Sequence, residues 1–205
     1  MKKTVFLFST LALLFAQSCV APVNLQFDSA TMLEAGESEI QTSGSAYYYI
    51  DDGDADLTNV NFGYKVGYGF TEKYNLKFRQ EFLFVDQEKV SVFSELDNKF
   101  KLHKNFALSF PAGYYTNAEV VAVTPRLYCT VYPSKKVDLT LMSKLNYQLD
   151  LQTNESYLYP SFSLGLGFIS KNQQWSFRPE IGWEFYSCYG FAITKKFNRP
   201  RFYRK

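Results

Sequence analysis

The feature that most constrains this chain is an alternation of apolar and polar side chains that recurs from residue 39 to residue 197. In residues 60–70 (VNFGYKVGYGF), for example, every second side chain is a valine, tyrosine or phenylalanine. Successive side chains of a β-strand point to opposite faces, and the spacing of an amphipathic helix does not fit this pattern. The chain beyond residue 38 is therefore predicted to be all β.

The alternation divides into ten segments separated by short polar turns. The segments are 39–50, 59–70, 74–86, 89–102, 105–116, 120–132, 137–149, 157–169, 175–185 and 188–197. Strands that cross a bilayer need about nine to eleven residues, whereas strands of globular sheets usually have about five or six. Long strands in an even number predict a closed antiparallel transmembrane β-barrel of about ten strands. Eight strands are the alternative, because 39–50 and 188–197 are the weakest segments.

Charged residues of these segments gather on one face. The apolar face carries only Asp86 and Lys195, both near segment ends. The other face carries seventeen charged residues: Glu39, Lys65, Lys77, Arg79, Glu81, Lys89, Glu95, Asp97, Lys99, Lys101, Arg126, Asp138, Lys144, Arg178, Glu180, Glu184 and Lys196. A soluble barrel or two-sheet sandwich would bury the apolar face instead. Lipid fits that face better, since in water it would form a very large apolar patch.

The charged face is predicted to line a polar lumen. The expected lumen cluster is Lys65, Lys77, Arg79, Glu81, Glu95, Asp97, Arg126, Lys144, Arg178, Glu180 and Glu184. These side chains are expected to pair with one another, because a buried charge without a partner is costly. Ten strands with so many charged interior residues indicate a closed or nearly closed lumen. Pro111, Pro125, Pro160 and Pro179 argue against the barrel, because each removes a hydrogen bond from a predicted strand.

The N-terminus has the pattern of an exported protein. Residues 1–18 combine a basic start with a twelve-residue apolar run at 5–16, which is too short to span a bilayer as a helix. Residues 15–19 (FAQSC) resemble a bacterial lipoprotein signal, in which Cys19 becomes the acylated N-terminus. Plain secretion, with Cys19 an incidental thiol, is the alternative. Residues 19–38 are predicted to be a linker, and residues 198–205 a basic periplasmic tail.

From about Gly36 to Phe197 the chain resembles the small outer-membrane β-barrel proteins of Bacteroidota, several of which carry lipoprotein-type signals. The resemblance rests on residues 19–24 (CVAPVN), 61–78 (NFGYKVGYGFTEKYNLKF), 124–127 (TPRL) and 178–183 (RPEIGW). It implies a barrel in the outer membrane of a Gram-negative bacterium, with both termini in the periplasm. It implies no activity.

Nothing in the sequence predicts an enzyme, a metal or a cofactor. The only histidine, His103, falls in a predicted turn without a nucleophile beside it. The acidic residues 51–56 (DDGDAD) lack a recognisable calcium pattern, and a solvated loop is favoured. A net charge of +2 excludes a polybasic nucleic-acid binder. The chain is predicted to be a non-enzymatic protein with a structural or accessory-subunit role. Its expected partners are outer-membrane lipids and other outer-membrane proteins. The alternatives are a narrow channel or small-ligand binder, and a soluble periplasm-facing β-sandwich lipoprotein.

Overall fold

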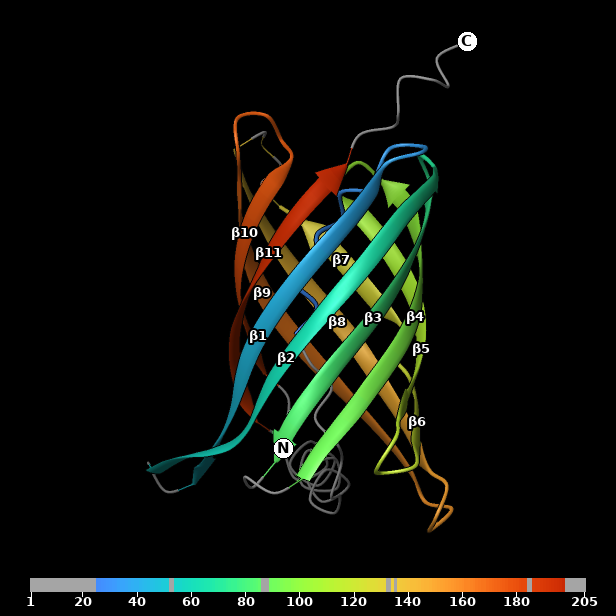
Figure 1. Ribbon diagram of the computed structural model, residues 1–205, viewed down its shortest axis with the longest axis vertical. Helices are drawn as coiled ribbons and strands as arrows, with labels where there is room; N and C mark the ends of the chain where they lie inside the picture. Colours follow the sequence, from blue (N-terminus) through green and yellow to red (C-terminus); the bar gives the residue numbers. More distant parts are fainter. Residues whose placement is uncertain are drawn as a thin grey trace, which may run out of the picture.

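The computed structural model describes residues 25–51, 54–85, 89–131, 134, 136–183 and 186–197. It contains one antiparallel sheet that closes on itself (Figure 1). Its elements are β1 (Ser38–Asp51), β2 (Asp54–Thr71), β3 (Tyr74–Val85), β4 (Lys89–His103), β5 (Phe106–Tyr115), β6 (Val120–Val123), β7 (Arg126–Thr130), β8 (Val137–Asp150), β9 (Ser156–Ile169), β10 (Trp175–Trp183) and β11 (Ser187–Phe197).

The sheet is a ten-stranded barrel. β1 pairs with β2 on one side and with β11 on the other, which closes the ring. β6 and β7 lie end to end between β5 and β8 and together occupy a single strand position. The prediction of a closed antiparallel barrel of about ten strands is confirmed. The eight-strand count and the two-sheet sandwich are wrong, because every strand belongs to one closed sheet.

The strand prolines are accommodated within the closed sheet. Pro111, Pro160 and Pro179 lie inside β5, β9 and β10, while Pro125 separates β6 from β7. Around this break Thr124 N–H donates to the Pro111 carbonyl at 3.1 Å, and Leu145 N–H donates to the Pro125 carbonyl at 3.0 Å. Pro125 therefore interrupts the regular ladder without opening the wall.

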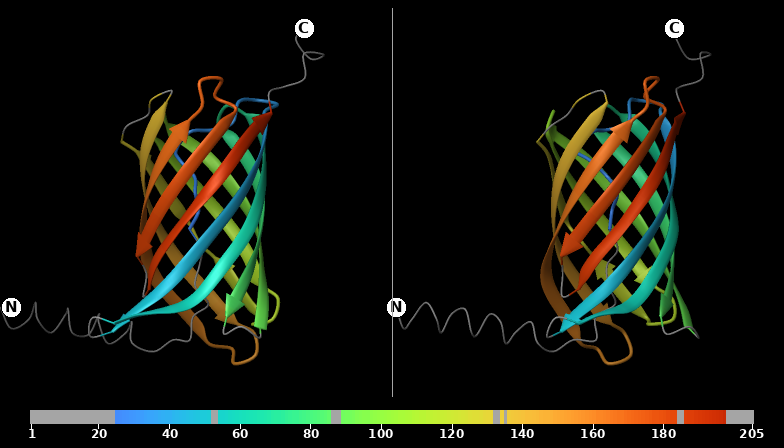
Figure 2. Two further views of the ribbon diagram at one scale, coloured as in Figure 1. Left: turned by 60° about the vertical axis from the view of Figure 1, so that its left-hand side comes forward. Right: turned by 90° about the vertical axis from the view of Figure 1, so that its left-hand side faces the viewer.

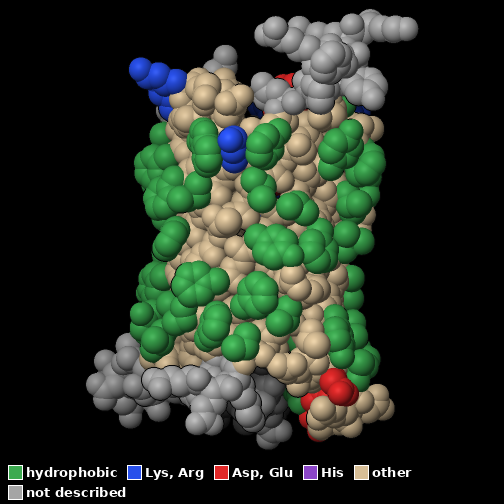
Figure 3. Space-filling model, viewed as in Figure 1, with side chains coloured by type: hydrophobic (Ala, Val, Ile, Leu, Met, Phe, Trp, Pro, Cys, Tyr) green, Lys and Arg blue, Asp and Glu red, His purple; other side chains and the backbone are tan. Residues whose placement is uncertain are grey.

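The outer wall of the barrel is apolar. Hydrophobic side chains spread over the face shown in Figure 3, from one end of the strands to the other. Phe62, Phe162 and Phe191, from three different strands, are each more than half exposed. Lys195, a charged residue of this face, lies near the end of β11 and sits over the rings of Trp175 and Phe197. None of the described residues forms a helix long and apolar enough to cross a membrane.

A charge in the middle of this wall tests whether it faces lipid. Phe162 lies near the centre of β9 and is 57% exposed. Phe162→Arg is expected to lower the free energy of unfolding by about 2–4 kcal/mol, because arginine at the bilayer midplane is costly. Leu158→Arg, near the strand end and 60% exposed, is the control and should cost about 0–1 kcal/mol. Denaturant unfolding in phospholipid vesicles measures both. Equal losses would contradict a membrane-embedded wall.

Residues 25–37 run inside the barrel, and we call this segment the strap (Figure 2, where it is drawn in blue). Leu25, Phe27, Ala30 and Leu33 of the strap are each at most 3% exposed. At its end, Gly36 N–H donates to the Gly69 carbonyl at 2.7 Å, and the chain turns into β1. The strap belongs to the region predicted as a linker. Its contacts with the inner wall are a structural role that the sequence pattern did not predict.

Candidate functional site

The inner face of the barrel holds most of the charged residues of the strands. Among the described residues, seven basic and six acidic strand side chains are buried there: Lys65, Lys77, Arg79, Lys99, Arg126, Lys144 and Arg178, with Glu39, Glu81, Glu95, Asp97, Asp138 and Glu180. The strap adds Asp28, whose side chain is 11% exposed. With Asp28 these buried, described groups number seven basic and seven acidic, so the strap carboxylate balances the buried charge.

Asp28 is the shared partner of three wall lysines. Its carboxylate accepts from Lys77 Nζ at 2.8 Å and from Lys99 Nζ at 3.0 Å, on β3 and β4. Lys65 Nζ, on β2, lies 3.6 Å from the same group. Lys77 also pairs with Glu39 on β1 at 2.6 Å. The three lysines are offset by two residues on neighbouring strands, since Lys65 pairs with Arg79 and Lys77 pairs with Asp97. One strap carboxylate lies within ion-pair distance of all three.

Charged wall residues also bind the backbone of the strap. Glu180 accepts from the N–H groups of Gln26 and Phe27, at 3.2 and 2.7 Å. Arg79 donates to the Leu25 carbonyl at 2.6 Å, and Lys65 donates to the Gln26 carbonyl at 3.0 Å. From Leu25 to Phe27 the wall side chains alternate between donors and acceptors of these hydrogen bonds. Buried backbone N–H and C=O groups need hydrogen-bond partners, which a neighbouring strand usually supplies. In the strap, ionised side chains of the wall supply these hydrogen bonds instead.

Further along the strap the contacts continue on β4 and β7. Lys99 donates to the Ser29 carbonyl, and its ammonium group lies 4.7 Å from the centre of the Tyr128 ring. Ala30 N–H donates to Thr130 Oγ1 at 2.9 Å. Thr130 and Tyr128 both lie on β7. The strap is therefore held by polar contacts from residue 25 to residue 30 and again at Gly36.

Apolar contacts accompany the polar ones at two levels of the barrel. Leu25 and Phe27 pack in a cluster with three wall residues, Tyr47, Cys188 and Ala192. The second cluster joins Ala30 and Met32 of the strap with wall residues Ala107, Tyr128 and Met142. Burying these strap side chains removes apolar surface from water, which stabilises the strap inside the lumen.

Other charges pair within the wall itself. The Arg126 guanidinium forms a two-point contact with the Glu95 carboxylate, one bond of which measures 3.0 Å, and Asp97 lies 3.6 Å away. Arg178 donates to Asp138 Oδ2 at 2.7 Å, between β10 and β8. Arg79 donates through Nε to Glu81 at 2.6 Å. Oppositely charged side chains thus lie against one another across the interior.

The structure brings ten of the eleven expected lumen residues together on the inner face, and Glu184 lies outside the described residues. Lys144 stands beside Arg126 in the register of β7 and β8. Sequence reasoning missed Asp28 as a site residue. A signal was present, because residues 25–33 hold several apolar side chains within the region predicted to be a linker. Cys19, residues 1–18 and residues 198–205 also lie outside the described residues.

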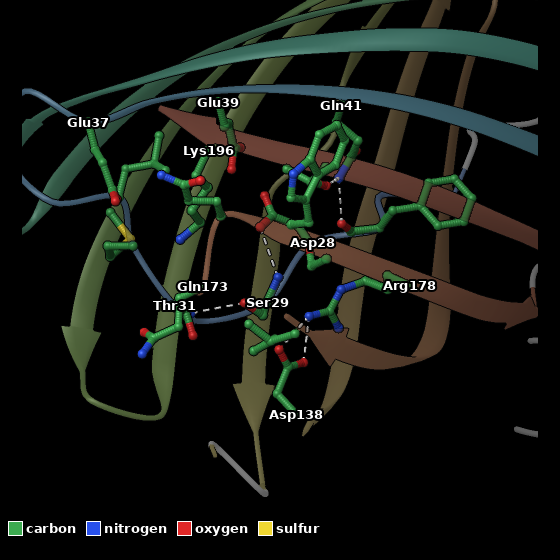
Figure 4. A pocket seen from close by; sticks show the side chains of 18 of the residues that line it. Asp28, Ser29, Thr31, Glu37, Glu39, Gln41, Asp138, Gln173, Arg178 and Lys196 are labelled. Carbon is green, nitrogen blue, oxygen red and sulfur yellow. Dashed lines mark hydrogen bonds and ion pairs between the residues drawn. The ribbon is translucent and has the colours of Figure 1, made fainter. Parts of the chain in front are cut away.

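A cavity of about 340 Å³ lies at the end of the barrel where β1 begins. Figure 4 shows Asp28, Glu39, Asp138 and Arg178 around it, with Arg178 bound to Asp138. Its lining mixes both signs of charge. His103 lies outside this lining and is exposed near Phe106. The described residues include no group of three or more His, Cys, Asp or Glu that could hold a metal ion. The arrangement holds a peptide segment in place.

Removing the Asp28 charge is expected to loosen the strap. Asp28→Asn leaves three buried ammonium groups around a neutral amide, and taking one partner from a buried ion pair is strongly destabilising. Amide hydrogen exchange over residues 26–33 should accelerate by about tenfold or more, which corresponds to about 1.4 kcal/mol. Glu34→Gln removes the same charge from an exposed strap position and is expected to leave the exchange unchanged. Identical exchange in both variants would contradict the role of Asp28.

Comparisons with known proteins found matches among solved structures. Neither a protein-family model nor a curated protein matches the sequence. Among solved structures, the KdgM porin is similar with a TM-score of 0.47 and 10% identity, over 78% of this chain and 99% of that chain. A de novo designed transmembrane β-barrel is similar with a TM-score of 0.41 and 11% identity, over 80% and 98%. The N-terminal β-barrel domain of Pseudomonas aeruginosa OprF gives a TM-score of 0.39 and 12% identity, over 80% and 100%.

Proposed function

We propose that the chain is a non-enzymatic outer-membrane β-barrel protein with a structural or accessory-subunit role. In this proposal the protein is exported by the signal at residues 1–18, is acylated at Cys19, and belongs with the small Bacteroidota barrels that it resembles. Its partners are outer-membrane lipids and other outer-membrane proteins. Its lumen serves to hold the strap and carries no solute.

One observation carries this proposal: an apolar wall encloses a lumen that the strap occupies and whose charges are paired. The wall exposes phenylalanine and leucine along whole strands, as lipid contact requires. Inside, Asp28 and the wall carboxylates pair with the wall lysines and arginines. An open pore would need a water-filled path through the barrel. Here the strap lies in the lumen, and its residues from Gln26 to Ala30 form hydrogen bonds with wall side chains.

The test combines fractionation with electrophysiology. The complete chain is expected in the outer-membrane fraction, with a gel mobility that shifts on boiling, and to give no conductance steps in planar bilayers. Conductance steps at moderate voltage with the complete chain would contradict the proposal and would indicate that the protein is a narrow channel. The proposal would also be wrong if cleavage near Cys19 released the protein from membranes and its gel mobility did not change on boiling. That result would indicate a soluble domain on a lipid tether.

A further inference from the structure

The two rims of the barrel differ in charge. One rim carries the β2–β3, β4–β5, β7–β8 and β9–β10 turns, and we call it the short-turn rim. The opposite rim, where Asp51 of β1 pairs with Asp54 of β2, is the far rim. On the face shown in Figure 3, lysine or arginine side chains lie near the end where β10 begins, and a group of acidic side chains lies at the opposite end. The charges outside the lumen are therefore separated along the barrel axis.

Each turn of the short-turn rim holds an exposed lysine, and two further lysines stand at strand ends beside these turns. Lys101 N–H donates to the Lys73 carbonyl at 2.9 Å, so two of the lysines lie on neighbouring backbone segments. Within the described parts of these turns, Glu72 is the single acidic residue. Glu34 and Glu37 of the strap line the cavity inside this ring. We call the set of lysines the basic collar: Lys73, Lys101, Lys104, Lys136, Lys171 and Lys195.

The collar lysines have no acidic partner among the described residues. None of the six forms an ion pair there, whereas three lysines of the lumen share the carboxylate of Asp28. The fold thus leaves positive charge at the short-turn rim that the described carboxylates do not neutralise. This charge is available to an anionic partner outside the chain.

The far rim is acidic. Glu119 lies exposed in the β5–β6 turn, and Asp150 and Glu155 lie at the β8–β9 turn. β1 ends on an aspartate and β2 begins on one. Among the described residues of this rim, Lys89 at the start of β4 is the single basic one. An anionic partner is therefore attracted to one rim of the barrel and repelled from the other.

Aromatic rings of the outer wall adjoin the collar. Phe70 and Tyr74 stack across the β2–β3 turn with ring centroids 5.7 Å apart, and Tyr74 stacks on Phe100 at 5.2 Å. The ammonium group of Lys195 lies 4.9 Å from the centre of the Trp175 ring. Aromatic rings of membrane proteins are enriched at the level of the lipid headgroups. The collar therefore continues the lipid-facing wall at the level where the headgroups of the surrounding lipids lie.

We propose that the basic collar binds the headgroups of anionic phospholipids in the leaflet at the short-turn rim. This inference rests on the proposed membrane barrel and adds the class of lipid and the rim that selects it. A lysine near an anionic bilayer surface strengthens the attraction by about fivefold. The collar places lysines in all four turns of the rim, so the preference extends around the barrel. Rings also lie near the far rim, where Tyr48 and Tyr189 are 6.1 Å apart, so charge and not aromatic content distinguishes the two rims.

The two tryptophans of the chain report on the two rims separately. Trp175 begins β10 at the short-turn rim and Trp183 ends it at the far rim, and both side chains are exposed. Full-length Trp183→Phe and Trp175→Phe proteins, each with one tryptophan left, are reconstituted in phosphatidylcholine vesicles that contain phosphatidylglycerol. Fluorescence quenching by brominated acyl chains, carried by one lipid class at a time, measures the relative affinity of each rim for the two lipids. Trp175 is expected to report a preference of at least about fivefold for phosphatidylglycerol, and Trp183 none.

Two sets of substitutions assign the preference to the collar. Changing the four turn lysines to glutamine should abolish the preference reported by Trp175, and changing the same four to arginine should keep it. The four are Lys73, Lys104, Lys136 and Lys171. Gel mobility with and without boiling checks that both variants fold. An unchanged preference in the glutamine variant, or an equal preference at Trp183, would overturn the inference.

The outcomes separate the inference from the proposed function. If brominated phosphatidylcholine quenches both tryptophans but Trp175 shows no preference for phosphatidylglycerol, the barrel lies in the bilayer and the inference alone is wrong. If soluble polyglutamate then changes the emission of Trp175 and high salt abolishes that change, the partner of the collar is a soluble acidic chain. If neither tryptophan is quenched by either lipid, the wall does not face lipid and both proposals fall.

Discussion

A variant that lacks residues 25–36 is expected to conduct ions in planar bilayers, whereas the complete chain is expected to be silent. The strap supplies the apolar side chains of Leu25, Phe27 and Met32, which pack against the inner wall at two levels of the lumen. Without them the interior is lined by ionised groups and fills with water. A ten-stranded wall is wider than the eight-stranded wall whose interior side chains alone can fill. Single-channel recording measures the effect.

The channel opened by this deletion should prefer anions. Loss of Asp28 leaves Lys65, Lys77 and Lys99 without their shared carboxylate, and the described wall then has seven buried basic and six buried acidic groups. Rings of lysine or arginine favour anions in pores. Deleting residues 198–205 is the control, which leaves the strap intact and should stay silent. If the deletion variant still folds, as judged by a gel mobility that changes on boiling, and yet gives no conductance steps, the prediction is wrong. That result would show that the wall side chains alone close the lumen.

The second large effect is expected from Arg126, which has a fully buried side chain. Arg126→Met removes the partner of Glu95 and the neighbouring cation of Asp97. Two buried carboxylates then lose the guanidinium that lies between them, and only their β3 partners in the register, Arg79 and Lys77, remain as neighbouring cations. Breaking a buried ion pair in this way is expected to lower the free energy of unfolding by about 3–5 kcal/mol. Denaturant unfolding of the protein in detergent micelles or vesicles gives the value.

A compensating variant identifies the cause of this loss. Arg126→Met combined with Glu95→Gln and Asp97→Asn removes all three charges, and most of the lost stability should return, because neutral groups are far less costly to bury. Thr124, which accepts from Arg126 at 2.9 Å, stays in place in both variants. If the single variant were as stable as the parent, the pairing within the wall would contribute nothing measurable to the fold.

Much of the barrel could be predicted from the sequence because its strands obey a simple rule. An exposed apolar wall and a polar interior force alternation, so residues such as Phe62 and Lys65 fall on opposite faces whatever the details of packing. The predicted segments agree with the strands to within a few residues at most ends. The exceptions have local causes: Pro125 divides one predicted strand into β6 and β7, and β2 begins at Asp54, five residues earlier than expected.

The strap could not be predicted in the same way. Residues 25–37 contact the wall through Asp28, through backbone groups and through apolar side chains at irregular intervals, so no period of two or of a helix appears. Their environment depends on which wall residues surround them, namely Glu180, Lys99 and Thr130 from three different strands. Only the three-dimensional closure of the barrel brings these partners together. Besides the apolar side chains of residues 25–33, the excess of basic over acidic residues on the predicted lumen face is the feature of the sequence that points to an additional acidic group.

Cross-linking the strap to the wall tests the central claim most directly. Ala30→Cys is combined with Thr130→Cys, two positions joined by a 2.9 Å hydrogen bond, in a chain with Cys129→Ser and Cys188→Ala. The matched control combines Ala30→Cys with Ala122→Cys, which lies in a cluster of wall residues near the far rim. Oxidation should give a mobility shift on a denaturing gel for the first pair and none for the control. No shift in the first pair, in a barrel that still folds, would contradict a strap seated in the lumen.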